Sequence, residues 1–443
     1  MLISNDPKEL QAMLDFVNKF ALDNEFEFNV GKCKTMKFHR KCSVTFNLGG
    51  EVLEEAATYR YLGIDLGRTM HTNSRPSPFK THFKRIERKT RARGMVARYL
   101  GSQRDGLRPK TALKLYTALC RPLLEYASPV IVHSKSNLNE LEKLQNLIVK
   151  RSLGLRDNTK TASVRVVSGI PPLATRFAFL KLKHLRRITM KPESALVRVV
   201  YQKIRQQESE RPGFLTECQN LCTDFEIDYE QLTNFDVETT LLEFGAQLKK
   251  DLYTYSFQRD LAAIKISNQA SILASLFPPQ SSYYSYRPLD LAIRVLHREN
   301  RTARTSFFQN LVGSSKLSNC IDPKCKFCKS KLENISHYLF DCATIQTIRT
   351  KFVSKISKQL TEINPHVSDL WQKSLRHLQT ESGRKTACAI LFGGNFAVDS
   401  DGAWELFRKT HYKAFHESDR TCIATARHLE KLGHLLDRLT ENP

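Results

Sequence analysis

The sequence predicts an α+β fold, with a small partial sheet near the N-terminus followed by a mostly helical remainder and a small zinc-binding segment. Residues 1–75 combine one amphipathic helical run with short segments of alternating apolar residues, whereas most later segments follow helical periods. Four candidate metal ligands lie between Cys325 and Cys342. The chain has 443 residues, 41% of them hydrophobic, so it is long enough for about three domains at roughly 150 residues each.

The N-terminal segment begins with a helix and continues with strands. Asn5 or Asp6 is the candidate N-cap, Pro7 suits the first helical position, and apolar residues recur at helical spacing over residues 6–22. Short extended segments are expected after the helix, at residues 26–30, 35–38, 43–48 and 59–66. We expect Gly49 and Gly50 to form the turn between the last two of these segments.

Helical periods dominate after a linker that contains Pro and Ser at residues 74–78. Helices are expected over residues 79–101, 109–120, 136–153, 173–189, 229–253, 258–274, 343–361, 366–380 and 403–438. Gly, Pro and Asn residues mark the breaks between several of them. The expected domains are residues 1–75, 76–205, 206–315, 316–345 and 346–443.

Positive charge is concentrated in one part of the chain. Residues 80–205 hold 29 Lys and Arg residues against 7 Asp and Glu residues, so they carry +22 of the formal charge of +24. Residues 206–260 are acidic, with 4 basic and 12 acidic residues. An even spread would favour solvated helix faces, whereas a clustered block favours contact with nucleic-acid phosphates.

Four residues within a short span have the spacing of a zinc site. Cys325 and Cys328 form a C-x2-C pair, and His337 and Cys342 form an H-x4-C pair that we expect on a short helix. Cys and His are the usual ligands of tetrahedral zinc, and four protein ligands leave no position for a catalytic water. The alternative is a group of free buried cysteines, and Cys320 is the main rival for a ligand position.

Nothing in the sequence indicates a membrane protein or a secreted one. No run approaches the roughly 18 consecutive apolar residues that a membrane span needs. The first ten residues lack a basic and apolar secretion signal, and the 11 cysteines then favour thiols or metal ligands over disulfides. We therefore expect an intracellular protein, nuclear or cytoplasmic, without a membrane partner.

Several segments resemble motifs of non-LTR (LINE-type) retrotransposon reverse transcriptases, and they follow the family's order. The fourth palm motif is matched by FNVGKCKTMKFHR, the primer grip by TYRYLGIDL, the thumb motif by LKLYTALCRPLLEYASPV and the next helix by LEKLQNLIVKRSLGL. The matching residues are Asn29, Lys32, Lys34, Met36, Phe38, Tyr61, Leu62, Gly63, Ile64, Tyr116, Ala118, Pro122, Tyr126, Ala127, Leu141, Glu142, Gln145, Arg151 and Gly154. The Cys325–Cys342 cluster resembles the family's C-terminal zinc knuckle.

The resemblance implies a domain order: the end of a palm (1–75), a basic helical thumb (76–205), a helical connector (206–315), a zinc knuckle (316–345) and a C-terminal helical region (346–443). It implies that Lys34 lies near the incoming triphosphate and that Tyr61, Leu62 and Gly63 position the primer. Phosphate contacts are expected from Lys84, Arg88, Arg91, Arg98, Arg121, Lys150 and Arg151. The implied partners are RNA and DNA as template and primer.

The catalytic carboxylates of that family are absent from the chain. Polymerases hold two metal ions with acidic residues, and this family uses an Asp-Asp pair, yet no Asp-Asp dipeptide occurs here. We expect the chain to begin just after that pair, so we expect no catalytic residue in it. Alone, it should have no activity and no small-molecule substrate. Mg²⁺ would be a cofactor only of an intact polymerase. The alternatives are a non-enzymatic nucleic-acid-binding protein and a decayed element whose product need not fold.

Overall fold

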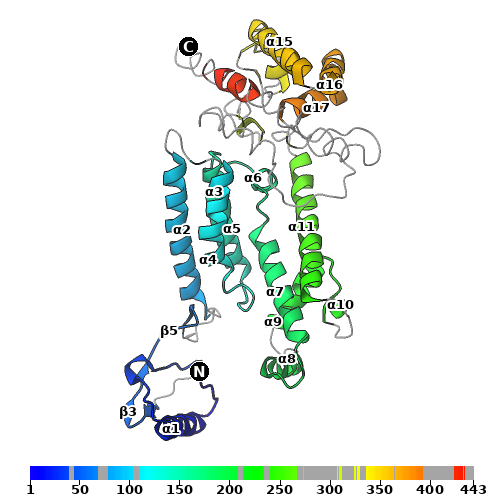
Figure 1. Cartoon of the computed structure of the whole chain (residues 1–443). Coiled ribbons are helices and arrows are strands. Elements are labelled where there is room, and N and C mark those ends of the chain that lie inside the picture. The colour runs from blue at the N-terminus through cyan, green and yellow to red at the C-terminus, as the bar shows by residue number, and fades with distance from the viewer. Residues whose placement is uncertain are drawn as a thin grey trace. The chain divides into compact units, whose positions relative to one another are not determined.

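A computed structural model describes most of the chain, and the residues that it covers form two units. The described residues are 1–38, 44–67, 78–102, 107, 109–207, 213–233, 240–266, 273, 307, 309–311, 324, 325, 327–329, 336–363, 365–392, 424–432 and 434. The first unit spans Met1–Lys89 and the second spans Thr90–Pro443. Figure 1 shows the elements of both units in chain order by colour.

The first unit is built on the predicted N-terminal helix, α1 (Pro7–Asp23). The Asp6 carboxylate caps this helix by accepting a hydrogen bond from the backbone N–H of Lys8 at 2.9 Å, so the capping prediction is confirmed. A small core of Phe46, Leu48 and Leu53 packs against the apolar side of α1. Two hydrogen bonds add to this modest core, because Gln11 of α1 donates to the carbonyl of Asn47 and accepts from its backbone N–H, each at 3.0 Å.

The strands of the first unit are short and pair in three separate two-stranded arrangements. The strands are β1 (Lys34–Thr35), β2 (Asn47–Leu48), β3 (Glu51–Val52), β4 (Glu54–Glu55), β5 (Thr58–Tyr61) and β6 (Ile64–Gly67). β1 pairs with β4 in parallel, whereas β2 with β3 and β5 with β6 form antiparallel hairpins. The extended segment expected at residues 26–30 was wrong, because Val30–Lys32 forms a 3-10 turn and no strand covers 26–29.

The expected strand over residues 59–66 is a hairpin instead. Leu62 and Gly63 form its two-residue turn, with φ angles of 46° and 79°. Gly49 and Gly50 join β2 to β3, not to the later segment, with φ angles of 61° and 88°. Two central residues with positive φ suit the turn that matches the twist of a hairpin, and the second turn was missed because Leu is an uncommon residue there.

The second unit is helical among its described residues. Its helices are α3 (Pro109–Leu115), α4 (Arg121–Glu125), α5 (Lys135–Ser152), α6 (Thr161–Ser168), α7 (Leu173–Thr189), α8 (Leu196–Gln207), α9 (Phe214–Asp224), α10 (Tyr229–Thr233), α11 (Leu241–Lys265), α15 (Gln346–Ile363), α16 (Pro365–Arg376) and α17 (Glu381–Phe392). α2 (Lys80–Ser102) runs from the first unit into the second. Residues 424–432 are helical as well.

Most predicted helices are present, but some boundaries differ. The helices expected at 79–101, 136–153, 173–189 and 343–361 correspond to α2, α5, α7 and α15 within a few residues. The helix expected at 109–120 continues past Pro122, because the π-helix Tyr116–Cys120 leads directly into α4. The pair expected at 229–253 and 258–274 divides differently, into α10 and a single long α11.

α7 lies at the centre of the second unit's core. It contacts α4, α5, α8, α9, α10 and α11, and α11 runs alongside it (Figure 1). Leu173, Ala178, Leu182 and Leu185 on α7 are fully buried, and the last three belong to one large apolar cluster. A helix that is covered on most sides needs apolar residues around much of its circumference, and the sequence of α7 provides them.

Residues of the two thumb-like motifs form one buried hydrogen-bond network. The Tyr116 hydroxyl donates to Gln145 Oε1 at 2.5 Å, and Gln145 Nε2 donates to the Pro171 carbonyl at 2.9 Å. Glu142 accepts from Arg165 Nη2 at 2.6 Å and from the backbone N–H of Leu173, the first residue of α7. These motif residues therefore hold α5 against the start of α7.

Among the described residues, no helix is both long enough and apolar enough to cross a membrane.

Candidate metal centre and nucleic-acid interface

The four predicted metal ligands come together in the structure. The ligand atoms of Cys325, Cys328, His337 and Cys342 all lie within 4.8 Å of one another. Cys325, His337 and Cys342 are buried, whereas Cys328 is partly exposed. Cys320, the rival ligand, lies outside the described residues.

The distances in this cluster fit tetrahedral zinc. The sulfur atoms of Cys325 and Cys342 are 3.8 Å apart, and Cys328 Sγ lies 3.3 Å from His337 Nε2. Zinc bonds sulfur at about 2.3 Å, and a tetrahedral angle then places two sulfur atoms about 3.8 Å apart. A disulfide would need about 2.05 Å, so the cluster has the spacing of a metal site.

A tight turn brings Cys325 and Cys328 to the same side. The Cys328 N–H points at Cys325 Sγ, 3.5 Å away, and the Lys329 N–H donates to the Cys325 carbonyl at 2.8 Å. Lys329 adopts a φ of 59°, the left-handed region that closes the turn. Local backbone contacts are thus enough to orient the sulfur atoms of Cys325 and Cys328 toward the same side.

A π-helix brings His337 and Cys342 to the same side. Residues His337–Asp341 form this helix, and the Cys342 N–H donates to the His337 carbonyl at 2.8 Å. Residues five apart in an α-helix point about 140° away from each other, because each residue turns the chain by about 100°. The wider π turn reduces this offset, so the H-x4-C spacing matches the kind of helix that forms.

Two arginines hold the π-helix in place. Arg384 of α17 makes a two-point ion pair with Asp341, at 2.7 and 3.1 Å. Arg349 of α15 donates to the Cys342 carbonyl at 2.6 Å. Groups behind metal ligands restrict the positions that the ligands can take, and these two contacts do so for Cys342.

The Cys342 thiol is held in a setting that disfavours its anion in the metal-free protein. Burial is the largest cause, and the neighbouring Cys325 and Cys328 add to it, against a hydrogen bond from Ile345, so the pKa of Cys342 rises to about 11. A bound divalent cation reverses this balance, because it stabilises the thiolate. The donor set therefore fits a structural zinc ion.

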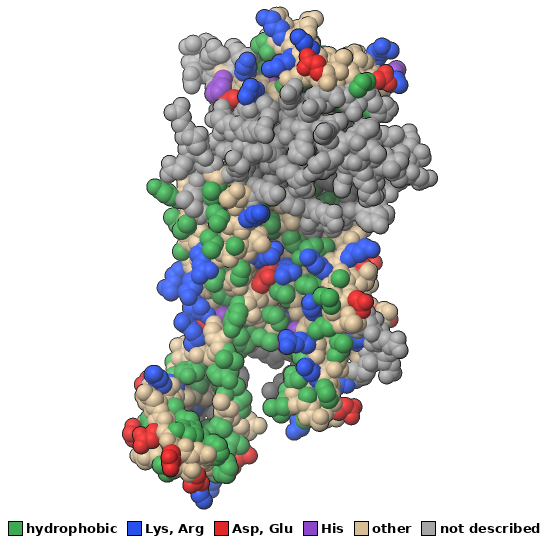
Figure 2. Space-filling view, in the orientation of Figure 1, with side chains coloured by type: hydrophobic (Ala, Val, Ile, Leu, Met, Phe, Trp, Pro, Cys, Tyr) green, Lys and Arg blue, Asp and Glu red, His purple; other side chains and the backbone are tan. Residues whose placement is uncertain are grey.

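The predicted nucleic-acid contacts fall into two groups. Lys84, Arg88 and Arg91 are exposed on α2, and Figure 2 shows Lys and Arg side chains gathered over this helix. Arg98 lies in α2 as well, but its side chain is outside the described residues. These exposed cations have the placement that contact with a phosphate backbone requires.

The other three predicted cations have partners within the protein. Arg121 pairs with Glu125 at 3.3 Å, and Arg151 pairs with Asp157 at 3.1 Å. Lys150 is buried and its ammonium donates to the Asp157 carbonyl at 2.7 Å. Burial lowers the pKa of Lys150, and the nearby Asp157 counteracts this effect.

Other cations of the basic block also lie in the interior. Lys181, Arg186 and Arg198 are 1%, 2% and 4% exposed. Lys181 donates to the Ile131 carbonyl at 2.8 Å and pairs with Glu217. The charge of the block is therefore divided between the surface and structural ion pairs, which the sequence count did not distinguish.

The residues expected near the primer and the triphosphate all belong to the first unit. Lys34 lies on β1 and pairs with Glu54 of β4. Tyr61 ends β5, and Leu62 and Gly63 form the turn of the β5–β6 hairpin. Tyr61 and Leu62 are 37% and 71% exposed, so both side chains are accessible.

Sequence reasoning missed one group of charged residues in the first unit. Asp65 lies in the segment expected as a strand over residues 59–66, where it is 5% exposed and accepts from Arg60 and Arg85. Recognising the hairpin would have revealed the pair, because Arg60 lies opposite Asp65 in its register. Arg384 was missed as well, since 43 residues separate it from Asp341.

Comparisons with known proteins find distant relatives among mobile elements. The chain is 25% identical over 190 residues to the RNA-directed DNA polymerase from mobile element jockey of Drosophila funebris. It is 24% identical over 188 residues to the protein of the same name from Drosophila melanogaster. Each alignment covers 42% of this chain but 20% of the relative, so the match spans about a fifth of each relative's length.

These similarities support the resemblance to reverse transcriptases that the motifs indicated. No family model matches the chain. No solved structure matches it either.

Proposed function

We propose that the chain is the C-terminal part of a non-LTR retrotransposon reverse transcriptase and that it binds template and primer. The observation that carries this proposal is the distant similarity to the jockey RNA-directed DNA polymerases. In this assignment α1 and the short strands belong to the end of the palm, and the helices from α2 to α8 belong to the thumb. The segment around Cys325–Cys342 is the zinc knuckle, and residues 206–315 connect it to the thumb.

The exposed cations of α2 support the binding role. Lys84 and Arg88 lie one helical turn apart and are exposed, so both are accessible to nucleic-acid phosphate. Such contacts hold a nucleic acid without selecting its sequence. Arg121, Lys150 and Arg151 add less to the proposal, because each is engaged within the protein.

The proposed zinc ion has a structural role. Cys325, Cys328, His337 and Cys342 would hold it with all four coordination positions. The ion would join two short segments, one that carries Cys325 and Cys328 and one that carries His337 and Cys342. It would supply rigidity and no reaction step.

A non-enzymatic nucleic-acid-binding protein is the second candidate. The absence of an Asp-Asp pair from the sequence favours it, since template-directed polymerisation needs carboxylates that hold two metal ions. We expect the purified chain, given template, primer, nucleotides and Mg²⁺, to leave the primer unextended. Primer extension by this chain would contradict the assignment of the catalytic residues to a segment outside it.

The binding proposal is tested with a labelled primer–template duplex in a fluorescence anisotropy titration. We expect an affinity that falls steeply as salt rises, because cations on the nucleic acid are released on binding. Lys84→Glu with Arg88→Glu should weaken binding at least about tenfold, since two favourable contacts become repulsive. Lys250→Glu with Lys265→Glu is the control, with the same charge change at exposed positions of α11. Equal losses in both double variants would contradict a specific role for α2.

A further inference from the structure

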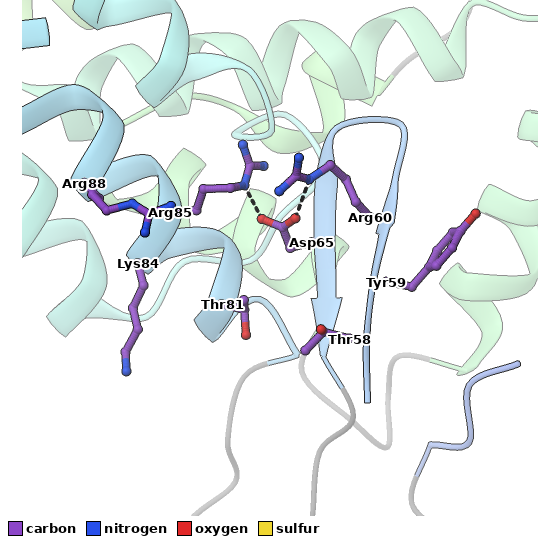
Figure 3. A pocket seen from close by; sticks show the side chains of 8 residues that line it. All are labelled: Thr58, Tyr59, Arg60, Asp65, Thr81, Lys84, Arg85 and Arg88. Atoms are coloured by element: carbon purple, nitrogen blue, oxygen red, sulfur yellow. Dashed lines mark hydrogen bonds and ion pairs between the residues drawn. The ribbon is translucent and has the colours of Figure 1, made fainter. Parts of the chain in front are cut away.

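A pocket in the first unit is lined mainly by cations and hydroxyl groups. It lies between the β5–β6 hairpin and the first turns of α2, and its volume is about 520 Å³. The residues that line it are Thr58, Tyr59, Arg60, Asp65, Thr81, Lys84, Arg85 and Arg88 (Figure 3). The lining therefore holds four cations and a single carboxylate.

Asp65 binds two of these cations. Arg60 Nε donates to Asp65 Oδ1 at 2.7 Å, and Arg85 Nε donates to Asp65 Oδ2 (Figure 3). Burial alone would raise the pKa of Asp65, but the hydrogen bonds and charges of Arg60 and Arg85 outweigh it and lower the pKa. The carboxylate is thus ionised at neutral pH, and it holds the two guanidinium groups on either side of itself.

The side chains around Asp65 retain unused donors. Each arginine presents several N–H groups, and the described contacts of Arg60 use only its Nε. Arg85 also donates through Nη2 to the Gly63 carbonyl at 2.5 Å, which ties α2 to the hairpin turn. In the part of the chain that the structure describes, neither Lys84 nor Arg88 has an ion pair. A net excess of three positive charges thus surrounds a space that hydroxyls of Thr58 and Thr81 also border.

We propose that this pocket binds a phosphate group of a nucleic-acid strand. Tetrahedral oxyanions accept several hydrogen bonds at once, and arginines suit them because their N–H groups form a planar fork. Arg60 would contact the phosphate from the hairpin, and Lys84 and Arg88 would contact it from α2. The assignment to a nucleic-acid strand, rather than a free phosphate, rests on the function proposed above, whereas the anion pocket stands on its own residues.

Asp65 has a positioning role in this proposal. Its negative charge by itself opposes an anion in the pocket, but it fixes Arg60 and Arg85 in the geometry that presents their remaining donors. The two effects predict opposite results for Asp65→Asn. A positioning role predicts weaker phosphate binding, whereas a simple charge effect predicts tighter binding.

The test uses a double variant of the full chain that carries both Arg60→Gln and Arg88→Gln. Its affinity for the duplex is compared with that of the wild type at several salt concentrations. We expect about a tenfold weaker affinity and a salt slope smaller by about one, because the two cations share one phosphate and its loss releases about one counter-ion fewer. Lys250→Gln with Lys265→Gln is the control and should leave both quantities unchanged. Unchanged affinity and slope in the pocket variant, while the wild type binds normally, would overturn the proposal.

Pyrophosphate separates the pocket from the nucleic-acid assignment. We expect pyrophosphate to bind the wild type in calorimetry, to compete with the duplex, and to lose affinity in the pocket variant. Binding of pyrophosphate without competition would overturn the assignment to a strand. If the wild type binds pyrophosphate but no duplex, the function proposed above fails while the anion pocket remains.

Asp65→Asn completes the test. We expect duplex binding at least about threefold weaker than wild type, with an unchanged circular dichroism spectrum, although the variant has one negative charge fewer. Arg88→Gln alone is the second measurement, because this exposed side chain has no role in the fold among the described contacts. Tighter duplex binding by a folded Asp65→Asn variant would overturn the positioning role.

Discussion

Glu142 illustrates how a residue of a thumb-like motif stabilises the fold. Its carboxylate accepts from Arg165, which also donates to Asp260 of α11 at 3.2 Å, and from the first N–H of α7. The Glu142 and Arg165 side chains are each 14% exposed, so water replaces the lost contacts poorly. The carboxylate thus serves as both an ion-pair partner and a helix cap.

We expect Glu142→Gln to lower the free energy of unfolding by about 2–3 kcal/mol, because it leaves a largely buried arginine without one of its carboxylates. Urea denaturation followed by circular dichroism measures this change. Glu140→Gln is the matched control on the same helix, since its pair with Lys143 is exposed and worth well under about 1 kcal/mol. Equal losses in the two variants would contradict the network.

At the scale of residues, the sequence predicted the candidate metal ligands better than it predicted the interaction partners of charged side chains. Cys325, Cys328, His337 and Cys342 were identified from spacing alone, because local geometry determines which of them can share a metal. The surroundings of Lys150 and Asp65 were not predicted. Whether a charged side chain is buried depends on contacts with distant segments, and one sequence does not reveal those contacts.

Among the elements, the π-helix His337–Asp341 connects the candidate metal centre to the C-terminal helices. Arg384 reaches it from α17 and Arg349 from α15, so two helices restrict its position. The geometry of the metal site should therefore depend on residues that touch no ligand atom. This dependence separates a supported site from four cysteine and histidine residues that meet by chance.

We expect the purified chain to contain about one zinc ion, and Cys342→Ser to contain much less, because three ligands bind zinc more weakly than four. Arg384→Gln should lower the zinc affinity by about tenfold through the loss of its pair with Asp341. A competition titration with a chromophoric chelator measures both changes. Lys373→Gln is the control, as its pair with Asp369 is exposed. Full affinity in Arg384→Gln would show that the π-helix needs no such support.

The helix at residues 424–432 contains a buried histidine that makes stability depend on pH. The ring of His428 stacks on Phe352 with centroids 4.0 Å apart. Burial, and to a smaller extent Lys431, lower the pKa of His428 to about 4. The unfolded chain therefore takes up a proton at this histidine at a higher pH than the folded chain does.

We expect the contribution of neutral His428 to the free energy of unfolding to be complete above about pH 6.5. This contribution should be lost as the pH falls toward 4, which lowers the free energy of unfolding by up to about 3 kcal/mol. Denaturant titrations of the wild type and His428→Gln at pH 7, 6, 5 and 4.5 measure it. The variant should be less stable at pH 7 and should lose less stability on acidification. Parallel pH profiles would contradict the assignment to His428.

At the scale of elements, helices were predicted more successfully than strands. α2, α5 and α7 have long apolar periods that leave few alternatives, so their ranges were close. α6 (Thr161–Ser168) and α8 (Leu196–Gln207) were not predicted; α6 is too short for a clear period. The strands are two to four residues long, and their pairing depends on turns such as Leu62-Gly63 that ordinary turn preferences do not indicate.

In the molecule as a whole, the two units differ in the size of their cores. The described core of the first unit contains Phe46, Leu48 and Leu53, whereas one large cluster extends across the helices of the second. Several aromatic residues of the first unit are exposed, among them Phe16 at 70% and Phe20 at 54%. Buried apolar area is the main source of stability, so the units should open at different free energies.

We expect hydrogen exchange to be faster in residues 1–70 than in residues 80–190, because fewer apolar side chains protect the hydrogen bonds of the first segment. Exchange of the full chain, followed by proteolysis and mass spectrometry, measures the protection of each segment. The exposed residues Met1, Leu2 and Ile3 serve as an internal reference for unprotected exchange. The opposite order of protection would contradict the inference from core size.

The broad organisation of the chain was predicted from the sequence, but the division of its cations between the surface and the core was not. The change from a small α+β segment to helices follows from local patterns and is present in the structure. The basic block was expected to face a duplex, yet Lys181 and Arg186 lie in the core. Counting charges along a chain cannot separate these roles, since both produce the same composition.

The contacts of Arg165 also affect the order in which the protein can fold during synthesis. Arg165 binds Glu142, 23 residues earlier, and Asp260, 95 residues later. The ribosome therefore releases α5, α6 and α7 well before the carboxylate that completes their charge balance has been made. Until α11 emerges, α6 and α7 expose the surface that packs against it, and chaperones that bind apolar surfaces can act during this interval.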